Sequence, residues 1–362
     1  PRALANFFDQ LVFQATTAAL GAEPFMLDPL ISTPAFFTVN TTLDTIDANP
    51  GDGVAEDAAG QTSLRAAIME LNALGHDYGT IIIPEGIYDL DIPGSDDENL
   101  AATGDLDLRV VMLISGQGQQ VTIQQTTGAN RVFEMLGTAS NTALSNLIIR
   151  GGRANRGGGI YAAGHLSLTL CRVIENEVEG DDLGPHGEGG GIWADSLSLD
   201  YCLVEKNRAT GRDGDAEFFD NGGDGRGGGV AVTSSLTVFN SRISENQAVG
   251  GRGGAEFDSV ATATPGGKGL GGGIYYTGEY SGSGYLESST IDGNEAVGGD
   301  GGDGDISAGN GGEARGGGLG GTPAYQQLVN VTLAGNRVIG ASGGVGTNVE
   351  GDAGSVRGPG AT

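Results

Sequence analysis

The side chains best suited to chemistry in this sequence are carboxylates, and many of them stand in glycine-rich segments. Asp300, Asp303 and Asp305 fall within six residues, as DGGDGD, and Asp220 and Asp224 belong to a similar stretch, DNGGD. Hard cations such as Ca²⁺ take carboxylate and carbonyl oxygens from segments of this kind. These five aspartates are therefore candidate calcium ligands, although neither stretch has the spacing of an EF-hand or of a calcium-binding β-roll. Two other interpretations stay open: a solvated acidic fringe, and glycine strands packed closely against one another.

Residues suited to acid–base catalysis are few. The three histidines, His76, His165 and His186, share no spacing, and lysine is nearly absent from the repeats described below. Polysaccharide lyases and hydrolases need carboxylates at a defined separation, held on rigid elements. We therefore assign no catalytic residue and expect no enzyme, keeping a polysaccharide lyase or hydrolase as the third alternative.

A repeat predicts the elements that position these segments. Five times a glycine triplet leads into an aliphatic residue, a strand of alternating side chains, an asparagine and, four residues later, another glycine. The triplets begin at Gly157, Gly189, Gly227, Gly271 and Gly316, and the asparagines are Asn176, Asn207, Asn246, Asn294 and Asn336. Repeats of this length built from strands form stacked units that share one core.

Aligning the repeats on the asparagine places like residues in columns. The position eight residues before it is Leu168, Leu199, Val238, Leu286 and Leu328 in turn. In-register parallel strands set such counterparts about 4.8 Å apart, and alternate side chains of each strand point to one face. The pattern predicts an all-β, right-handed parallel β-helix, because parallel crossovers are right-handed. The asparagines are expected to form a structural ladder at a corner, and the variable segments to leave from one edge.

The two cysteines occupy one column of this alignment. Cys171 and Cys202 both stand five residues before the asparagine, so they are expected to be neighbours on adjacent strands. In-register parallel neighbours have poor side-chain vectors for a disulfide, which favours a buried column of free thiols over a bridge.

Four regions are expected along the chain. Residues 1–36 form an N-terminal arm with a helix over 3–20 and an extended proline-containing segment, and residues 37–79 form a cap whose helix spans 63–74 and stops at Gly75. The β-helix occupies 80–340, and a glycine-rich tail occupies 341–362. Apolar residues of the arm need cover from water, either on the β-helix of the same chain or on a neighbouring copy, and the second alternative makes them candidate assembly residues. These are Phe7, Phe8, Leu11, Phe13, Phe25 and Phe36.

The cap region resembles a known family. Residues 37–42 (FTVNTT), 47–53 (DANPGDG), 62–68 (TSLRAAI) and 83–88 (IPEGIY) are similar to the N-terminal region of bacterial surface β-helix proteins named for a Cys-Ser-Leu-Arg-Glu-Ala motif. Thr62 and Ala66 depart from that motif. The repeats resemble the Gly-Gly-Ala-Ile and Phe-x-x-Asn units of polymorphic outer-membrane adhesins. The resemblance covers about residues 37–340 and implies a secreted β-helix of the bacterial cell surface, without implying a biochemical activity.

Composition limits the class of partner. The chain has 46 acidic and 18 basic residues and a formal net charge of −28, which argues against nucleic-acid binding. No apolar run is long enough to span a membrane as a helix. The acidic surplus fits an extracellular protein that meets divalent cations, so calcium is the one cofactor considered.

The last repeat leads to the predicted function. After Gly340 the sequence continues as one more glycine-rich segment, and no capping helix is expected. An uncovered last turn offers its core and strand edges to another chain. We expect an extracellular structural protein whose partners are other copies of itself, joined head to tail into a filament or matrix through the arm and this open end. The alternative is an adhesin-like fragment of a larger surface protein that binds a polysaccharide or a host-cell ligand.

Overall fold

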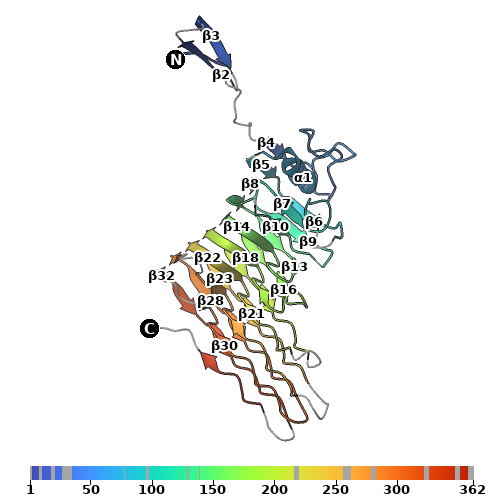
Figure 1. Cartoon of the computed structure of the whole chain (residues 1–362), viewed down its shortest axis with the longest axis vertical. Coiled ribbons are helices and arrows are strands. Elements are labelled where there is room, and N and C mark those ends of the chain that lie inside the picture. Colours follow the sequence, from blue (N-terminus) through green and yellow to red (C-terminus); the bar gives the residue numbers. More distant parts are fainter. Residues whose placement is uncertain are drawn as a thin grey trace.

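The chain folds into a parallel β-helix. The computed structural model describes residues 35–76, 78–94, 98–128, 130–137, 139–215, 220–255, 262–278, 283–321, 326–346 and 351–357, together with the backbone of three strands between residues 2 and 26. Apart from one helix the described elements are strands, and they stack along the long axis of the β-helix (Figure 1). The predicted fold class is therefore confirmed.

Four parallel sheets run along the β-helix, and we number them in the order in which one turn of the chain visits them. The first has thirteen strands: β4 Ala35–Thr38, β5 Tyr78–Ile83, β7 Leu106–Leu108, β8 Val111–Gly116, β10 Phe133–Met135, β11 Thr142–Ser145, β14 Ile160–Thr169, β18 Ile192–Asp200, β22 Val230–Phe239, β26 Ile274–Tyr276, β27 Gly284–Glu287, β31 Leu319–Gly321 and β32 Gln326–Val329. The second has eight: β6 Gly86–Leu90, β9 Val121–Gln125, β12 Ile148–Arg150, β15 Arg172–Ile174, β19 Leu203–Glu205, β23 Arg242–Ser244, β28 Thr290–Asp292 and β33 Thr332–Ala334.

The other two sheets occur only in the later turns. The third consists of β13 Arg153–Ala154, β16 Glu177–Glu179, β20 Arg208–Thr210, β24 Gln247–Val249, β29 Glu295–Val297 and β34 Arg337–Ile339. The fourth consists of β17 Gly187–Glu188, β21 Gly225–Arg226, β25 Gly269–Leu270, β30 Ala314–Arg315 and β35 Val356–Arg357. We call one complete turn of the chain a rung.

Left-handed residues make the corners of each rung. In the rung of β18, Tyr201 (φ 53°) turns the chain from the first sheet to the second, and Lys206 (φ 56°) turns it from the second to the third. Non-glycine residues adopt this conformation as single corner residues at some cost, which the pairing on both sides offsets. The same two corners recur in neighbouring rungs, with Leu170 and Glu175 before this one. The repeated corners keep every strand in register with the next.

The core is formed by the predicted columns. Leu168, Leu199, Val238 and Leu286 are all buried, as are their counterparts in the second sheet, Val173, Val204, Ile243 and Ile291. Cys171 and Cys202 lie beside these columns as free, buried thiols, as predicted. Burial raises the pKa of the Cys202 thiol to about 11, so this cysteine is inert at neutral pH.

Helix α1, Leu64–Leu74, covers the N-terminal end of the β-helix as predicted. The Ser63 side chain accepts from the backbone N–H of Ala66 at the start of the helix, and Gly75 ends it in the left-handed conformation. The helix is fastened by Arg65, whose buried guanidinium pairs with Asp44 at 2.6 Å and donates to backbone oxygens of residues 101, 104 and 105. The cap is therefore tied to the first rungs by a charged network as well as by its apolar stripe.

The helix expected over residues 3–20 is wrong. The chain forms three antiparallel strands there, β1 Arg2–Phe7, β2 Gln10–Thr17 and β3 Gly21–Met26, which pair only with one another among the described strands. The apolar spacing fits a helix, but Val12, Phe13, Thr16 and Thr17 favour extended chain. Pairing with β1 and β3 decides the outcome, which a single-segment pattern cannot anticipate.

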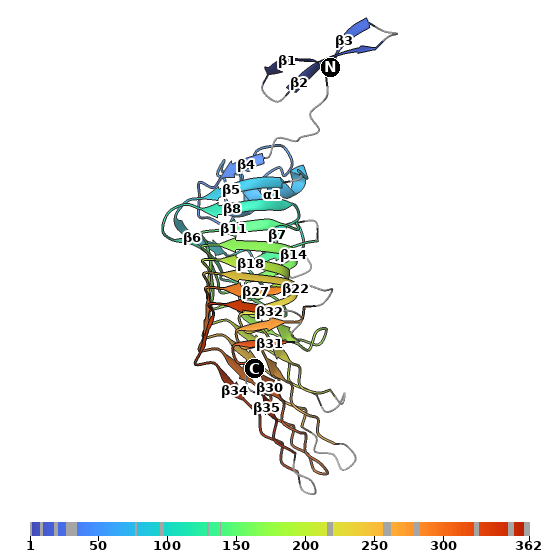
Figure 2. The same cartoon turned by 90° about the vertical axis from the view of Figure 1, so that its left-hand side faces the viewer.

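The variable segments form an ordered two-layer structure that we call the glycine fringe, comprising the described parts of residues 180–188, 211–226, 250–270, 298–315 and 340–357. The segments project together from one edge of the C-terminal half (Figures 1 and 2). Backbone hydrogen bonds cross between the two layers, including Gly251 N to Gly223 O (2.8 Å), Gly267 N to Gly251 O (2.8 Å) and Gly299 N to Gly267 O (2.9 Å). A Cβ atom on Gly267 would lie 1.8 Å from a backbone oxygen, so only glycine fits. Of the three interpretations left open, close glycine packing is the one confirmed.

Candidate functional site

The asparagine ladder is present as predicted and is continuous over five rungs. Asn207 Oδ1 accepts from the backbone N–H and from the Nδ2 of Asn176, both at 3.0 Å, and Asn207 Nδ2 donates to the Val173 carbonyl at 2.9 Å. Asn246, Asn294 and Asn336 repeat the arrangement. The side chains are buried from Asn176 to Asn294, so each rung's hydrogen bonds are completed by the next rung.

The glycine triplets are packed against this ladder. A Cβ on Gly191 would lie 2.8 Å from the Gly229 oxygen and 2.9 Å from the Asn207 side chain, and the third glycine of the other triplets is equally crowded. The first glycine of each triplet has positive φ, as Gly189 does at 68°. The glycine triplet and the asparagine recur together because a side chain on the third glycine would collide with the asparagine side chain.

The last rung is open. Leu328 and Leu333 are 45% and 46% exposed, whereas Leu286 and Ile291, one rung earlier in the same columns, are 0% exposed. Among the described strands, the last-rung strands β31, β32, β33, β34 and β35 each pair on one side only. The ladder ends here too, because among the described residues no oxygen accepts from the Asn336 backbone N–H. The last rung therefore has the surface of an interior rung without the neighbour that an interior rung has.

The predicted assembly residues lie at the opposite end of the sequence. Phe36 is on β4, the first strand of the thirteen-stranded sheet, and is 62% exposed. Phe7, Leu11, Phe13 and Phe25 belong to the backbone of β1, β2 and β3, where Phe13 and Phe25 are register partners. Phe8 lies outside the described residues. The structure thus places one of the six on a described, exposed surface.

The predicted calcium ligands are engaged within the glycine fringe. Asp224 Oδ1 accepts from the Lys268 backbone, Asp300 Oδ1 from Ser342 and Asp303 Oδ1 from Val345, each a donor one rung further on. Asp220 pairs with Arg212 at 3.0 Å, and Asp305 has interactions as well. Calcium binding by these five aspartates stays a prediction, and three of them, Asp224, Asp300 and Asp303, connect one rung to the next.

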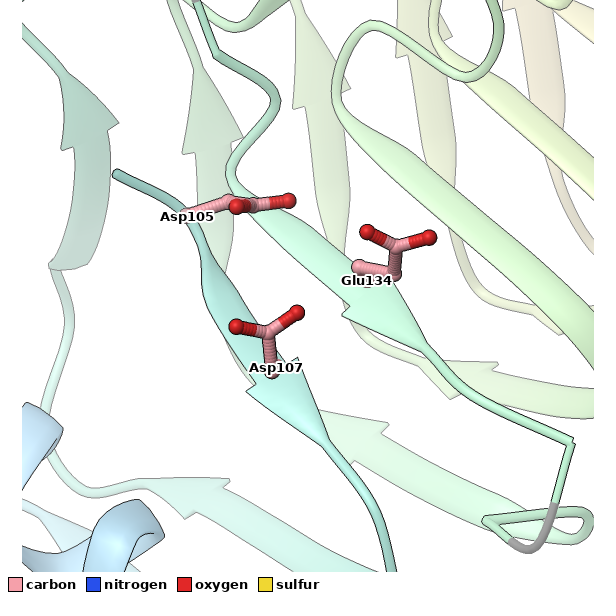
Figure 3. Close-up of side chains that lie close together, drawn as sticks. All are labelled: Asp105, Asp107 and Glu134. Carbon is pink, nitrogen blue, oxygen red and sulfur yellow. The ribbon is translucent and has the colours of Figure 1, made fainter. Parts of the chain in front are cut away.

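A different acidic cluster lies buried on the outer face of the first sheet, on the side opposite the core residues Leu106 and Phe133. Asp105, Asp107 and Glu134 are buried, and ligand oxygens of all three lie within 4.8 Å of one another. Figure 3 shows the Asp107 and Glu134 carboxylates on the adjacent strands β7 and β10, with Asp105 just ahead of β7. Burial, and then the charge of Asp105, raises the pKa of Asp107 to about 8. Among the described residues this is the one group of three such side chains close enough to share an ion.

The repeat pattern of the sequence does not predict this acidic cluster. All three residues precede the five regular repeats, so no column of the alignment relates them. The available signal was the alternation Asp105-Leu106-Asp107, which points two carboxylates to the same side of one strand.

An aromatic row lies on the outer face of the first sheet. Tyr161 and Trp193, register partners on β14 and β18, stack with ring centroids 4.7 Å apart and planes 9° apart. The next positions in this column are Ala231 and Tyr275. A cavity of about 120 Å³ lies at Ala231 and is lined by Trp193, Tyr275, Glu188 and Thr233. The stacked rings form a flat apolar surface, whereas Glu188 is paired with Arg156 and Arg226, both at 2.8 Å, and the Thr233 hydroxyl donates to Asp195.

Comparisons with known proteins do not assign a family. No family model matches the chain, and no curated protein matches it. Among solved structures, a chain described as Geobacillus virus E2 ORF18 aligns over 76% of this chain with 12% identity and a TM-score of 0.19. The alignment spans 55% of that protein's length, and a similarity this low carries no argument about fold or function.

One finding concerns membranes. Within the described part of the chain, no helix has the length and apolar character needed to cross a bilayer.

Proposed function

We propose that this protein is an extracellular structural subunit that assembles head to tail, with a second copy covering the open last rung. The observation that carries the proposal is the exposure of Leu328 and Leu333 in columns that are fully buried one rung earlier. An uncapped end of a solenoid favours association with whatever can continue the stack. The surplus of acidic residues, 46 against 18 basic, supports an extracellular location.

Covering the last rung stabilises the assembly through surface that the isolated chain exposes. Burying a whole leucine side chain contributes about 1.5–3 kcal/mol, and each of these two is about half exposed, so together they offer roughly 1.5–3 kcal/mol. Backbone groups on the free edges of β31 to β35 add hydrogen bonds to that term.

The occupant we propose is the N-terminal end of another copy, residues 1–36. This stretch has only four charged side chains, Arg2, Asp9, Glu23 and Asp28, beside its phenylalanines. Within the part of the chain that the structure describes, its strands β1 and β3 each pair on one side only, and Phe36 is exposed at its end. Contact between opposite ends of two copies is heterologous and produces an open filament.

The test is negative-stain electron microscopy of the full chain and of three variants. We expect fibres of even width from the wild type and from Leu183→Asp, because Leu183 is 96% exposed in the glycine fringe. Leu333→Asp and deletion of residues 1–34 should each abolish fibres while circular dichroism stays that of a folded β-protein. Isolated short rods from the wild type would contradict the proposal and favour further rungs of the same polypeptide as the cover. Fibres that survive the deletion would contradict the N-terminal end as the occupant of the last rung.

The aromatic row supports a second candidate function, an adhesin that binds surface carbohydrate. Trp193 is the single tryptophan of the chain, so its fluorescence reports on the cavity at Ala231 directly. Titration with neutral oligosaccharides should shift this fluorescence in the wild type and leave Ala231→Tyr, which fills the gap in the row, unchanged. An unchanged spectrum with every oligosaccharide would remove this candidate.

A further inference from the structure

The acidic cluster beneath the cap brings three buried carboxylates together. Asp105 and Asp107 are 0% exposed and Glu134 is 9% exposed. Arg131 approaches from one side, with Nη1 at 2.5 Å from Glu134 Oε2 and at 3.5 Å from Asp105 Oδ2. Among the described residues Asp107 forms no ion pair, and an ionised carboxylate buried without a cation beside it is strongly unfavourable.

Asp107 supplies an independent sign of a missing ligand. Its Oδ2 atom accepts from the backbone N–H of Ala101 at 2.8 Å, whereas its Oδ1 atom is buried and contacts no hydrogen-bond donor. A buried carboxylate oxygen without a partner carries the full cost of desolvation. In Figure 3 the Asp107 carboxylate projects from β7 into the space between Asp105 and Glu134.

We propose that Asp105, Asp107 and Glu134 bind one divalent cation, with Ca²⁺ as the ion that fits best. Calcium–oxygen distances are about 2.3–2.6 Å, so one ion can contact oxygens that lie up to about 5 Å apart. The three carboxylates satisfy this limit, with their ligand oxygens within 4.8 Å of one another.

The ion would stabilise the junction between the cap and the first rungs. Asp105 and Asp107 belong to the segment that is bonded to helix α1. The Arg65 guanidinium of α1 donates hydrogen bonds to the backbone oxygens of residues 101, 104 and 105 in this segment. Glu134 belongs to the following strand of the same sheet. One ion would therefore connect the segment beneath the helix with β10, independently of the glycine fringe and of any assembly at the last rung.

The experiment uses the full chain, treated with EDTA, dialysed and titrated with CaCl₂ at pH 7.5. Calorimetry should give about one tight site per chain, and the thermal midpoint should rise by several degrees. Asp107→Asn should lose both effects. Asp303→Asn is the matched control, because it changes an aspartate of the glycine fringe that accepts from the Val345 backbone, and it should keep both.

Three results would overturn the proposal. One is the absence of calcium binding and of any midpoint shift in the wild type, with Asp107→Asn as stable or more stable; the cluster is then neutralised by protons. Another is loss of both effects in Asp303→Asn with retention in Asp107→Asn, which would move the site to the fringe. The third is equal binding by both variants. Circular dichroism of Asp107→Asn ensures that lost binding is not lost folding.

Discussion

Asparagine fits the ladder because it combines an acceptor and two donors in one short side chain. Asn246 Oδ1 accepts two hydrogen bonds from Asn207, and its Nδ2 donates to the Val204 carbonyl and to Asn294. An aspartate in this place would lack the donors and would bury a charge. The ladder therefore restricts each of these positions to one residue type by hydrogen bonding alone.

Asn246→Ala should destabilise the β-helix far more than Asn336→Ala. The first change leaves the buried Asn207 N–H and the Val204 carbonyl without partners, at a cost of about 1–3 kcal/mol each. At Asn336 water can replace the lost contacts, because the last rung is open. Urea denaturation of both variants measures the difference, and equal losses would mean that the ladder contributes little.

Asp107 predicts a pH dependence in the ion-free protein. Its pKa of about 8 in the folded chain is above its usual value, so its contribution to stability is present at low pH and is lost as the pH rises from about 4 to about 8. Asp105, Glu134 and Glu98 raise this pKa, and Arg131 is the cation beside the cluster. In EDTA, the thermal midpoint of the wild type should match that of Asp107→Asn at about pH 4 and fall progressively below it as the pH rises to 9. A constant difference between the two across this range would show that Asp107 does not titrate as stated.

Among the elements, the strands of the repeats and helix α1 could be predicted, and the N-terminal strands and the acidic cluster could not. The repeats carry one signal five times in register, and α1 has an amphipathic stripe, Ser63 and Gly75 as boundary residues. Residues 3–20 had an apolar spacing compatible with a helix, and only pairing between strands distinguishes the alternatives. Asp107 and Glu134 are neighbours because β7 pairs with β10, and the sequence repeats do not predict this pairing.

The glycine triplet is required by its neighbours, so a substitution there has a predictable cost. Gly191→Ala should destabilise the protein by about 1–3 kcal/mol, because the added methyl group meets a backbone oxygen and the Asn207 side chain within an already packed interior. Gly184→Ala is the matched control, since its Cβ would approach only Asp181 Oδ1, at 3.9 Å. The control should be neutral or slightly stabilising. Equal denaturation midpoints for the two variants would contradict the crowding argument.

At the scale of the whole molecule, stability is expected to depend on position along the axis. Each rung contacts mainly the rungs before and after it, so interior rungs have two neighbours and the last has one. The N-terminal end has α1 and the Arg65 network as its cover. The β-helix is therefore asymmetric in stability as well as in shape.

Hydrogen exchange should show this asymmetry. In the unassembled chain, amides of residues 326–339 should exchange at least about tenfold faster than those of residues 236–249, because local opening is easiest where a rung lacks a neighbour. In assembled protein the first set should become protected and the second should not change. Identical protection of residues 326–339 in the two states would mean that assembly, where it occurs, uses another surface.

The asparagine ladder also has a direction. Every asparagine turns its oxygen toward the preceding rung and keeps its backbone N–H and one side-chain N–H for the following rung, so at Asn336 the ladder ends in donors. Two C-terminal faces brought together would set donors against donors, whereas a carbonyl-bearing face would complete the bonds. In the assembly that we propose, these donors would disfavour symmetric tail-to-tail pairing and favour growth in one sense along the axis.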